Sequence, residues 1–285
     1  MDDIRKTAVS HGFRPSPTMN SSRSEANEVL SRLPAGKARP TPLLFIHGAY
    51  AAAWCWEDHF LPFFAEAGYA AHALSLSGHG GSPGRRHLDS FSIADYVRDV
   101  VKMVDSMPVP PVLIGHSMGG FVVQKYLEDH VAPGAVLMCA VPPQGLMSAA
   151  VGLMFSKPSL MKDMNNLMSG GKNSVETLRE ALFAQEVSVD DLKRYYKNSQ
   201  SESHRAIWDM SLFGMPRTGR VKRTPLLVQG AEFDHLIPAS LVEMTARSYG
   251  VEAHIFPAMG HGMMLEKDWQ QPARQILEWL KELKL

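Results

Sequence analysis

The chain has 285 residues, of which 45% are hydrophobic and 20% charged, as in a globular protein with a sizeable buried core. It has 29 basic and 29 acidic residues, and this balance argues against nucleic-acid binding, which usually needs a basic excess. No apolar run reaches the roughly 18 residues of a membrane-spanning helix, and 2 cysteines are too few for a disulfide framework.

Residues 1–40 are polar, and we expect them to form a flexible N-terminal arm with one short helix over residues 24–33. The arm begins with two acids and lacks the apolar stretch of a secretory signal, so the expected location is the cytoplasm. The sequence leaves open both the role of the arm and the oligomeric state.

From Thr41 onward, strand-length apolar runs alternate with segments of helical spacing. The runs that predict strands are residues 42–48, 69–78, 111–117, 134–141, 224–230 and 251–261. The segments that predict helices are residues 56–67, 93–107, 121–130, 241–249 and 269–283, with Ser92 placed to cap the second. This alternation predicts an α/β fold, with a mainly parallel sheet covered by helices on both faces.

One interval breaks the alternation. Residues 142–224 contain no convincing strand and hold seven of the 17 methionines. We expect a helical lid inserted into a core formed by residues 41–141 and 225–285. Methionine usually fills cores, but it is also favoured at adaptable apolar binding surfaces.

Ser117 is the candidate nucleophile. It is the serine of a G-x-S-x-G pattern, "GHSMG", between a predicted strand and a predicted helix, as in a nucleophile elbow. Gly115 and Gly119 remove side chains that would collide with a serine on so tight a turn. The free N–H groups and positive dipole end of the following helix favour a developing oxyanion.

A serine nucleophile needs a base, and the base needs an acid that orients it. His261 directly follows a late strand, in a glycine-flanked loop at the carboxyl edge of the sheet, where α/β sites are built. Asp234 follows another strand and is the candidate acid, with Glu232 as the alternative. The chain order Ser117, Asp234, His261 is that of the α/β-hydrolases.

The oxyanion formed in acyl transfer needs two N–H donors. The Met118 N–H is the natural first donor, and the Ala49 N–H, in the loop "HGAY" after an early strand, would supply the second. His47 and Gly48 then shape this loop. Tyr50 is a candidate substrate-binding residue, although a packing role is as well supported.

Together, the motifs "HGAY", "SGHGGS", "GHSMGG", "GAEFDHLIP" and "GHGMMLE" resemble those of the α/β-hydrolase superfamily, over about residues 41–141 and 225–285. The resemblance implies a parallel sheet with a helical cap and a serine carboxylesterase or lipase-like activity. Because the usual two first strands are hard to find in the arm, the sheet is expected to be shortened.

The stretch "HGAYAAAWCWEDHF" is similar to a loop of plant methyl esterases and hydroxynitrile lyases. The lyases carry a lysine directly after the catalytic histidine, where this chain has Gly262, so the resemblance disfavours a lyase. Relatives often have Asp and Arg in place of Ser75 and Ser77, which puts the usual ionic anchoring of that loop in doubt. A serine nucleophile disfavours the dehalogenase and epoxide hydrolase branches, which need a carboxylate.

The expected function is therefore hydrolysis of a carboxylic ester of an apolar small molecule through an acyl-serine. The same three residues would also serve a thioesterase, lactonase or C–C bond hydrolase, and a ligand-binding receptor with little turnover is a further alternative. The sequence implies no metal and no cofactor, and the expected partner is the small-molecule substrate.

Overall fold

The computed structural model describes residues 26–147, 159, 162–163, 166, 174–221 and 223–285. Within them, one sheet has the strand order β1-β3-β2-β4-β5-β6-β7. The strands are β1 (Val29–Arg32), β2 (Leu43–Ile46), β3 (Ala71–Leu74), β4 (Val112–His116), β5 (Ala135–Met138), β6 (Leu226–Ala231) and β7 (Ala253–Phe256). β1 pairs with β3 in antiparallel fashion and every other pair is parallel, so the predicted mainly parallel sheet is confirmed.

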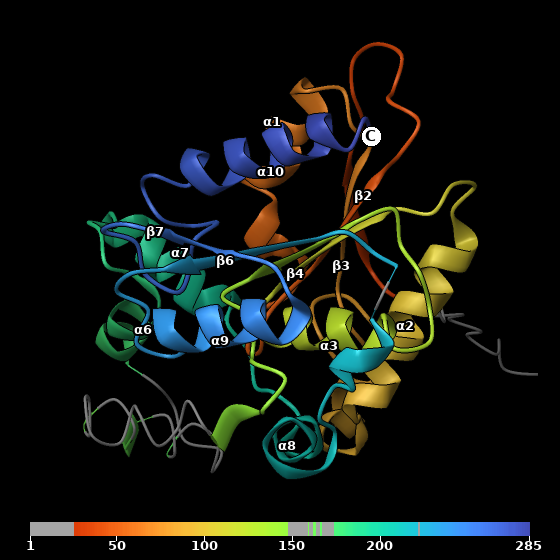
Figure 1. Ribbon diagram of the computed structural model, residues 1–285. Helices are drawn as coiled ribbons and strands as arrows, with labels where there is room; N and C mark the ends of the chain where they lie inside the picture. The colour runs from red at the N-terminus through yellow and green to blue at the C-terminus, as the bar shows by residue number, and fades with distance from the viewer. Residues whose placement is uncertain (1–25, 148–158, 160–161, 164–165, 167–173, 222) are drawn as a thin grey trace, which may run out of the picture.

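Helices cover both faces of the sheet, also as predicted. In Figure 1, α1 (Phe60–Glu66) and α10 (Gln270–Glu282) lie on one side of the strands. On the other side lie α2 (Ile93–Ser106), α3 (Met118–Tyr126) and α9 (Ala239–Tyr249). The strands are therefore buried on both faces, which explains their continuous apolar runs.

The buried apolar side chains form two clusters, one on each face, and β2 shows how a strand feeds both. Leu43 and Phe45 belong to the cluster beneath α1 and α10. Leu44 and Ile46 belong to the cluster beneath α2, α3 and α9. All four side chains are fully buried, because alternate residues of a strand point to opposite faces.

Two predicted helices differ from the structure at their starts. The helix expected over residues 56–67 begins later, as α1 at Phe60, and a separate 3₁₀ helix, η1 (Ala53–Trp56), precedes it. The helix expected from residue 121 begins at Met118, directly after Ser117. Ser92 caps α2 as predicted: its Oγ accepts from the Asp95 N–H at 3.2 Å, and the Asp95 carboxylate accepts from the Ser92 N–H at 2.8 Å.

The short helix expected over residues 24–33 is wrong, because Val29–Arg32 form β1. The segment is too short for its apolar spacing to distinguish helix from strand, and pairing with the edge of β3 decides the outcome. β1 adds one strand before the parallel series. Residues 1–25 of the expected arm lie outside the described residues.

The loop over residues 75–82 is anchored by carboxylates from two other elements. Ser75 Oγ donates to Glu28 Oε2 at 2.6 Å, just before β1. Ser77 donates to Asp99 of α2 through both its N–H, at 2.7 Å, and its Oγ, at 2.9 Å. Hydrogen bonds to Glu28 and Asp99 thus take the place of the ionic anchoring that the sequence placed in doubt.

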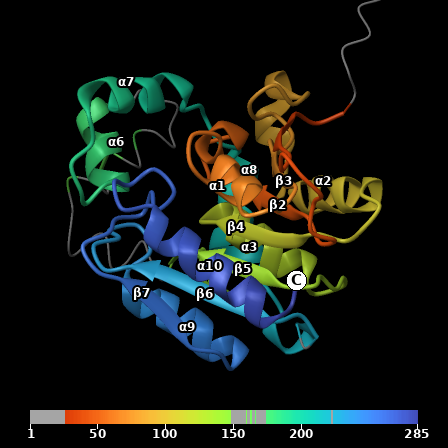
Figure 2. The ribbon, with the colours of Figure 1, turned by 90° about the horizontal axis from the view of Figure 1, so that it is seen from above.

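The described part of the interval between β5 and β6 is helical. It contains α6 (Val175–Leu182), α7 (Val189–Asn198), α8 (His204–Trp208) and the π-helix η3 (Asp209–Phe213). Figure 2 shows α6 and α7 together at one side of the molecule, with α2 at the opposite side. Across the described residues, no helix is both long and apolar enough to cross a membrane.

Candidate active site

Ser117 lies at the turn between β4 and α3. Its backbone has φ 53° and ψ −118°, in the positive-φ region that L-residues rarely adopt. The turn is held because Ser117 N donates to Met138 O at 3.0 Å, while Ser117 O accepts from Phe121 N at 3.2 Å and Val141 N at 3.1 Å. Since α3 begins at Met118, the free N–H groups of its first turn lie beside Ser117.

Glycines let the loop after β2 approach this turn closely. A Cβ atom at Gly119 would lie 2.3 Å from Ile46 O, and one at Gly48 would lie 3.0 Å from Ser117 Cβ. A Cβ atom at Gly115 would meet Gly119 O at 2.5 Å. The obstruction at Gly115 and Gly119 is therefore backbone, where the sequence analysis expected a collision with the serine.

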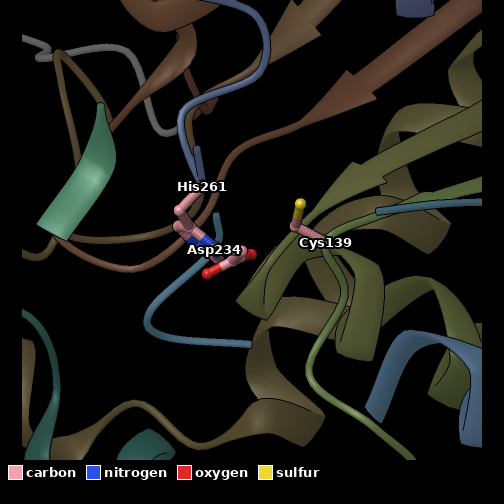
Figure 3. A group of neighbouring side chains, drawn as sticks. All are labelled: Cys139, Asp234 and His261. Carbon is pink, nitrogen blue, oxygen red and sulfur yellow. The ribbon is translucent and has the colours of Figure 1, made fainter. Parts of the chain in front are cut away.

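His261 and Asp234 form a buried pair. His261 Nδ1 lies 2.7 Å from Asp234 Oδ2, and Figure 3 shows the two side chains facing each other. Asp234 Oδ1 accepts from Leu236 N and Ile237 N, both at 2.8 Å. Because Asp234 Oδ2 faces Nδ1 as an acceptor, the neutral His261 ring carries its proton on Nδ1 and its lone pair on Nε2. This is the tautomer that a general base needs.

The alternative acid, Glu232, has a different contact. Its side chain is exposed, and Oε2 accepts from Ala258 N at 2.9 Å. The structure thus brings Asp234, rather than Glu232, to His261.

His116 links the Ser117 turn to the His261 loop, a role that the sequence analysis missed. Its Nε2 lies 2.8 Å from the carbonyl oxygen of His261 and therefore donates to it. The two imidazole rings have centroids 4.6 Å apart. The only sequence signal was that His116 directly precedes Ser117, at the end of a predicted strand.

His47 shapes the loop after β2, as the sequence indicated. Its Nε2 accepts from Leu76 N at 3.1 Å, so Nδ1 is the protonated nitrogen and donates to Gly48 O at 2.8 Å. The Gly48 carbonyl and the Ala49 N–H belong to one trans peptide and point in opposite directions. The hydrogen bond from His47 therefore fixes the direction of the Ala49 N–H.

The remaining predicted site residues lie around the same turn. Ala49 and Tyr50 are half-buried, and Met118 is fully buried. Burial raises the pKa of Tyr50, with Glu202 as a second cause, so its phenol stays neutral. Tyr50 has a φ of 63°, which is rare for a residue with a side chain.

Lowering the pH from 7 to 5 should destabilise the fold, because His47 and His116 are buried without charge. Burial lowers the pKa of His47 to about 3 and the pKa of His116 well below the usual 6.5. Below pH 6.5 the unfolded chain takes up protons that the folded chain does not, so the free energy of unfolding falls with pH. We expect a loss of roughly 3–4 kcal/mol for the two groups, measured by urea unfolding at both pH values.

Variants separate the contribution of the two histidines from that of the carboxyl groups, which also titrate in acid. His116→Asn keeps a donor for the His261 carbonyl and removes one titrating ring, so the free energy of unfolding should fall less steeply, by about 1 kcal/mol per pH unit averaged between pH 7 and 5. His87→Asn, at an exposed position, should leave the slope unchanged. Equal slopes for His116→Asn and the unmodified protein would contradict this account.

Cys139 is a buried, free core cysteine, as expected, but it also lies beside the pair. Its Sγ, a carboxylate oxygen of Asp234 and a ring nitrogen of His261 lie within 4.8 Å of one another (Figure 3). These atom types can bind zinc, but Asp234 already accepts hydrogen bonds from His261 and from two backbone N–H groups. Burial is the main cause that raises the pKa of Cys139, and the nearby Asp234 carboxylate is the second. The thiol therefore stays protonated.

The segment between β5 and β6, which we call the insert, contacts the His261 loop through the end of α6. Gly262 N donates to Leu182 O at 2.7 Å. The buried Glu266 carboxylate accepts from Gly260 N and Ala184 N, both at 2.7 Å. The His261 loop is therefore held from the side of the insert as well as by His116.

The ends of four parallel strands thus meet at one edge of the sheet. Ala49 follows β2, Ser117 follows β4, Asp234 follows β6 and His261 follows β7. This arrangement defines an α/β protein with its site at the carboxyl ends of the strands.

Comparison with known proteins agrees with this fold. The model of the alpha/beta hydrolase family matches residues 43–277, so the chain belongs to that family and is an enzyme of the α/β-hydrolase type.

Individual relatives are distant. A monoacylglycerol lipase of Mycolicibacterium smegmatis is 27% identical over 241 residues, which cover 78% of this chain and 81% of the lipase. Protein phosphatase methylesterase 1 of Bos taurus is 25% identical over 157 residues, covering 50% of this chain and 41% of the methylesterase. The solved structure of an esterase from Exiguobacterium antarcticum superposes with a TM-score of 0.67 at 18% identity, over 90% of this chain and 96% of the esterase, and shows the shared fold.

Proposed function

We propose that this enzyme hydrolyses carboxylic esters of apolar small molecules through an acyl-serine intermediate. The observation that carries the proposal is the buried pair of His261 and Asp234, at the same sheet edge as the turn of Ser117. The names of the lipase and methylesterase relatives support ester hydrolysis. The two free, buried cysteines support a cytoplasmic location, which is part of the proposal.

In the proposed reaction, Ser117 Oγ attacks the ester carbonyl carbon while His261 Nε2 takes the hydroxyl proton. Asp234 holds the imidazole by Nδ1 and stabilises its positive charge. When the bond to the alcohol breaks, His261 returns the proton to the departing oxygen. Water then attacks the acyl-serine by the same steps in the second half of the cycle, and the acid is released.

The negative charge that develops on the carbonyl oxygen needs donors that are already in place. We assign this role to the N–H groups of Ala49 and Met118. His47 orients the peptide of the first, and the start of α3 directly after Ser117 leaves the second without an intrahelical acceptor. Tyr50, next to Ala49, is proposed to contact the substrate.

An apolar substrate fits the residues next to the base. Met263 and Met264 follow His261 closely and are buried, and the half-buried Leu182 of α6 contacts the same loop. Methionine adapts to apolar ligands of varied shape. The helical insert between β5 and β6 is proposed to act as the lid over the substrate site.

A panel of p-nitrophenyl esters and matching thioesters, with acyl groups from acetyl to dodecanoyl, tests this function. We expect the highest kcat/KM with esters whose acyl chain is longer than acetyl, since more apolar area is buried. The Ser117→Ala variant, prepared in parallel, corrects for contaminating esterases.

The other outcomes of the panel are equally informative. Activity confined to acetyl esters would contradict the apolar pocket, and a higher kcat/KM with every thioester would indicate a thioesterase instead. A single acylation without turnover would indicate a receptor.

A further inference from the structure

We propose that residues 200–203 of the insert position the loop that carries the Ala49 N–H, with the Gln200 amide and the Glu202 carboxylate as the positioning groups. The proposal rests on the proposed function, because it assigns these residues to the oxyanion hole of the same site. We call residues 47–51 the oxyanion loop. The insert would then complete the catalytic site as well as cover it.

Gln200 binds the oxyanion loop at two carbonyl groups. Its backbone N–H donates to Tyr50 O at 3.0 Å, and its side-chain Nε2 donates to Ala51 O at 2.9 Å. Its Oε1 accepts from Gly80 N at 3.3 Å, in the neighbouring loop over residues 75–82. One half-buried side chain therefore joins the insert to both loops beside the site.

The oxyanion loop needs such support because its backbone is strained. Tyr50 has a φ of 63°, and an L-residue in this region costs roughly 1–2 kcal/mol. Strain of this kind persists only where the surroundings hold it. The backbone N–H of Gln200 binds the carbonyl of the strained residue itself, and its side-chain amide binds the next carbonyl, at Ala51.

Glu202 fixes the segment to the body of the enzyme. Its side chain is fully buried, and its Oε2 lies 3.0 Å from His79 Nε2. Its Oε1 accepts from Tyr96 OH at 2.8 Å and from Ser203 N at 2.7 Å. Burial alone would raise the pKa of Glu202, but His79 and these hydrogen bonds hold it below the usual range, so the carboxylate is ionised.

His79 links this carboxylate to the oxyanion loop. Its Nδ1 lies 3.1 Å from Ser77 O, so both ring nitrogens face oxygen atoms. The centroids of the His79 and His47 rings are 5.1 Å apart. Withdrawing Glu202 would leave His79 Nε2 buried without its partner, beside the residue that orients Gly48 O, and an unpaired buried polar group is costly.

The test compares three full-length proteins: the unmodified enzyme, the Gln200→Ala variant and a matched control variant at Gln185. Gln185 also joins the insert to the body, since its side chain donates to Asp268 Oδ2 at 3.0 Å and accepts from Asp268 N at 2.9 Å. None of its hydrogen bonds in the described part of the chain reaches the oxyanion loop. Gln185→Ala therefore removes comparable hydrogen bonds without the proposed positioning.

Two measurements report on the oxyanion hole. The first is kcat and KM with the best ester of the panel, and the second is the Ki of an alkyl trifluoromethyl ketone, which forms a tetrahedral oxyanion on the serine. We expect Gln200→Ala to lower kcat about 10- to 100-fold, with KM within about threefold, because a small displacement of one donor is costly. Its Ki should rise by a similar factor, whereas Gln185→Ala should change kcat and Ki less than about threefold.

A third variant sharpens the result. Gln200→Glu keeps the acceptor for Gly80 N but places a carboxylate oxygen against Ala51 O, so its kcat should fall at least as far as that of Gln200→Ala. Unchanged kcat and Ki in both Gln200 variants would overturn the inference, as would an equal loss in Gln185→Ala. If the unmodified enzyme neither hydrolyses any ester nor binds the ketone, the proposed function itself fails, which is a distinguishable outcome.

Discussion

Replacing Ser117 with alanine should lower kcat on the best ester by roughly 10⁴-fold or more, while the melting temperature stays within about 2 °C of the unmodified protein. The loss is large because the hydroxyl is the atom that forms the bond. The stability is unaffected because alanine keeps the backbone hydrogen bonds of the turn, from Ser117 N and to Ser117 O, and adds no atoms. Steady-state kinetics and differential scanning calorimetry measure the two quantities.

Retained ester turnover in Ser117→Ala, at more than about one per cent of the original kcat, would reject the nucleophile. A fall in melting temperature of more than about 5 °C would mean that the activity loss reflects damage to the fold. Neither outcome is compatible with a serine whose side chain acts only in the chemistry.

Replacing Asp234 with asparagine should lower kcat by about 10⁴-fold through the tautomer of His261. The asparagine oxygen can still accept from Leu236 N and Ile237 N. Its NH₂ group then faces His261 Nδ1, which must become an acceptor. The proton moves to Nε2, where the base needs a lone pair. The pH profile of kcat/KM and the ¹⁵N chemical shifts of His261 measure the change.

Glu232→Gln is the matched control for this variant. It removes a carboxylate two residues away that accepts only from Ala258 N among the contacts described. We expect its kcat to stay within about threefold of the unmodified enzyme. If Glu232→Gln lost as much activity as Asp234→Asn, the acid would be wrongly assigned.

The positions of the candidate site residues at strand ends were predictable from the sequence, because local patterns reveal where each strand ends. The runs before Ser117 and Asp234 are apolar enough to indicate buried parallel strands, and such strands end at one edge. The tight turn at Ser117 was predictable from its glycines. The strand β1 was not predictable from the sequence. It has four residues, of which two are apolar, and it becomes a strand only through pairing with β3.

The supporting contacts were beyond the reach of local patterns. Glu202 and His79 are 123 positions apart, and neither position shows a periodicity that predicts a buried contact between them. His116 and His261 meet only because β4 and the loop after β7 reach the same edge. The anchoring of Ser75 by Glu28 likewise depends on β1 lying beside β3. Contacts of this kind follow from the fold and not from neighbouring residues.

The central claim is that Ser117 is the residue that becomes acylated. The most direct test is to treat the enzyme with an alkyl fluorophosphonate and to locate the adduct by tandem mass spectrometry. The account predicts one adduct, on Ser117, formed in step with the loss of esterase activity and absent from Ser117→Ala. An adduct on another residue, or complete loss of activity with Ser117 unmodified, would contradict it.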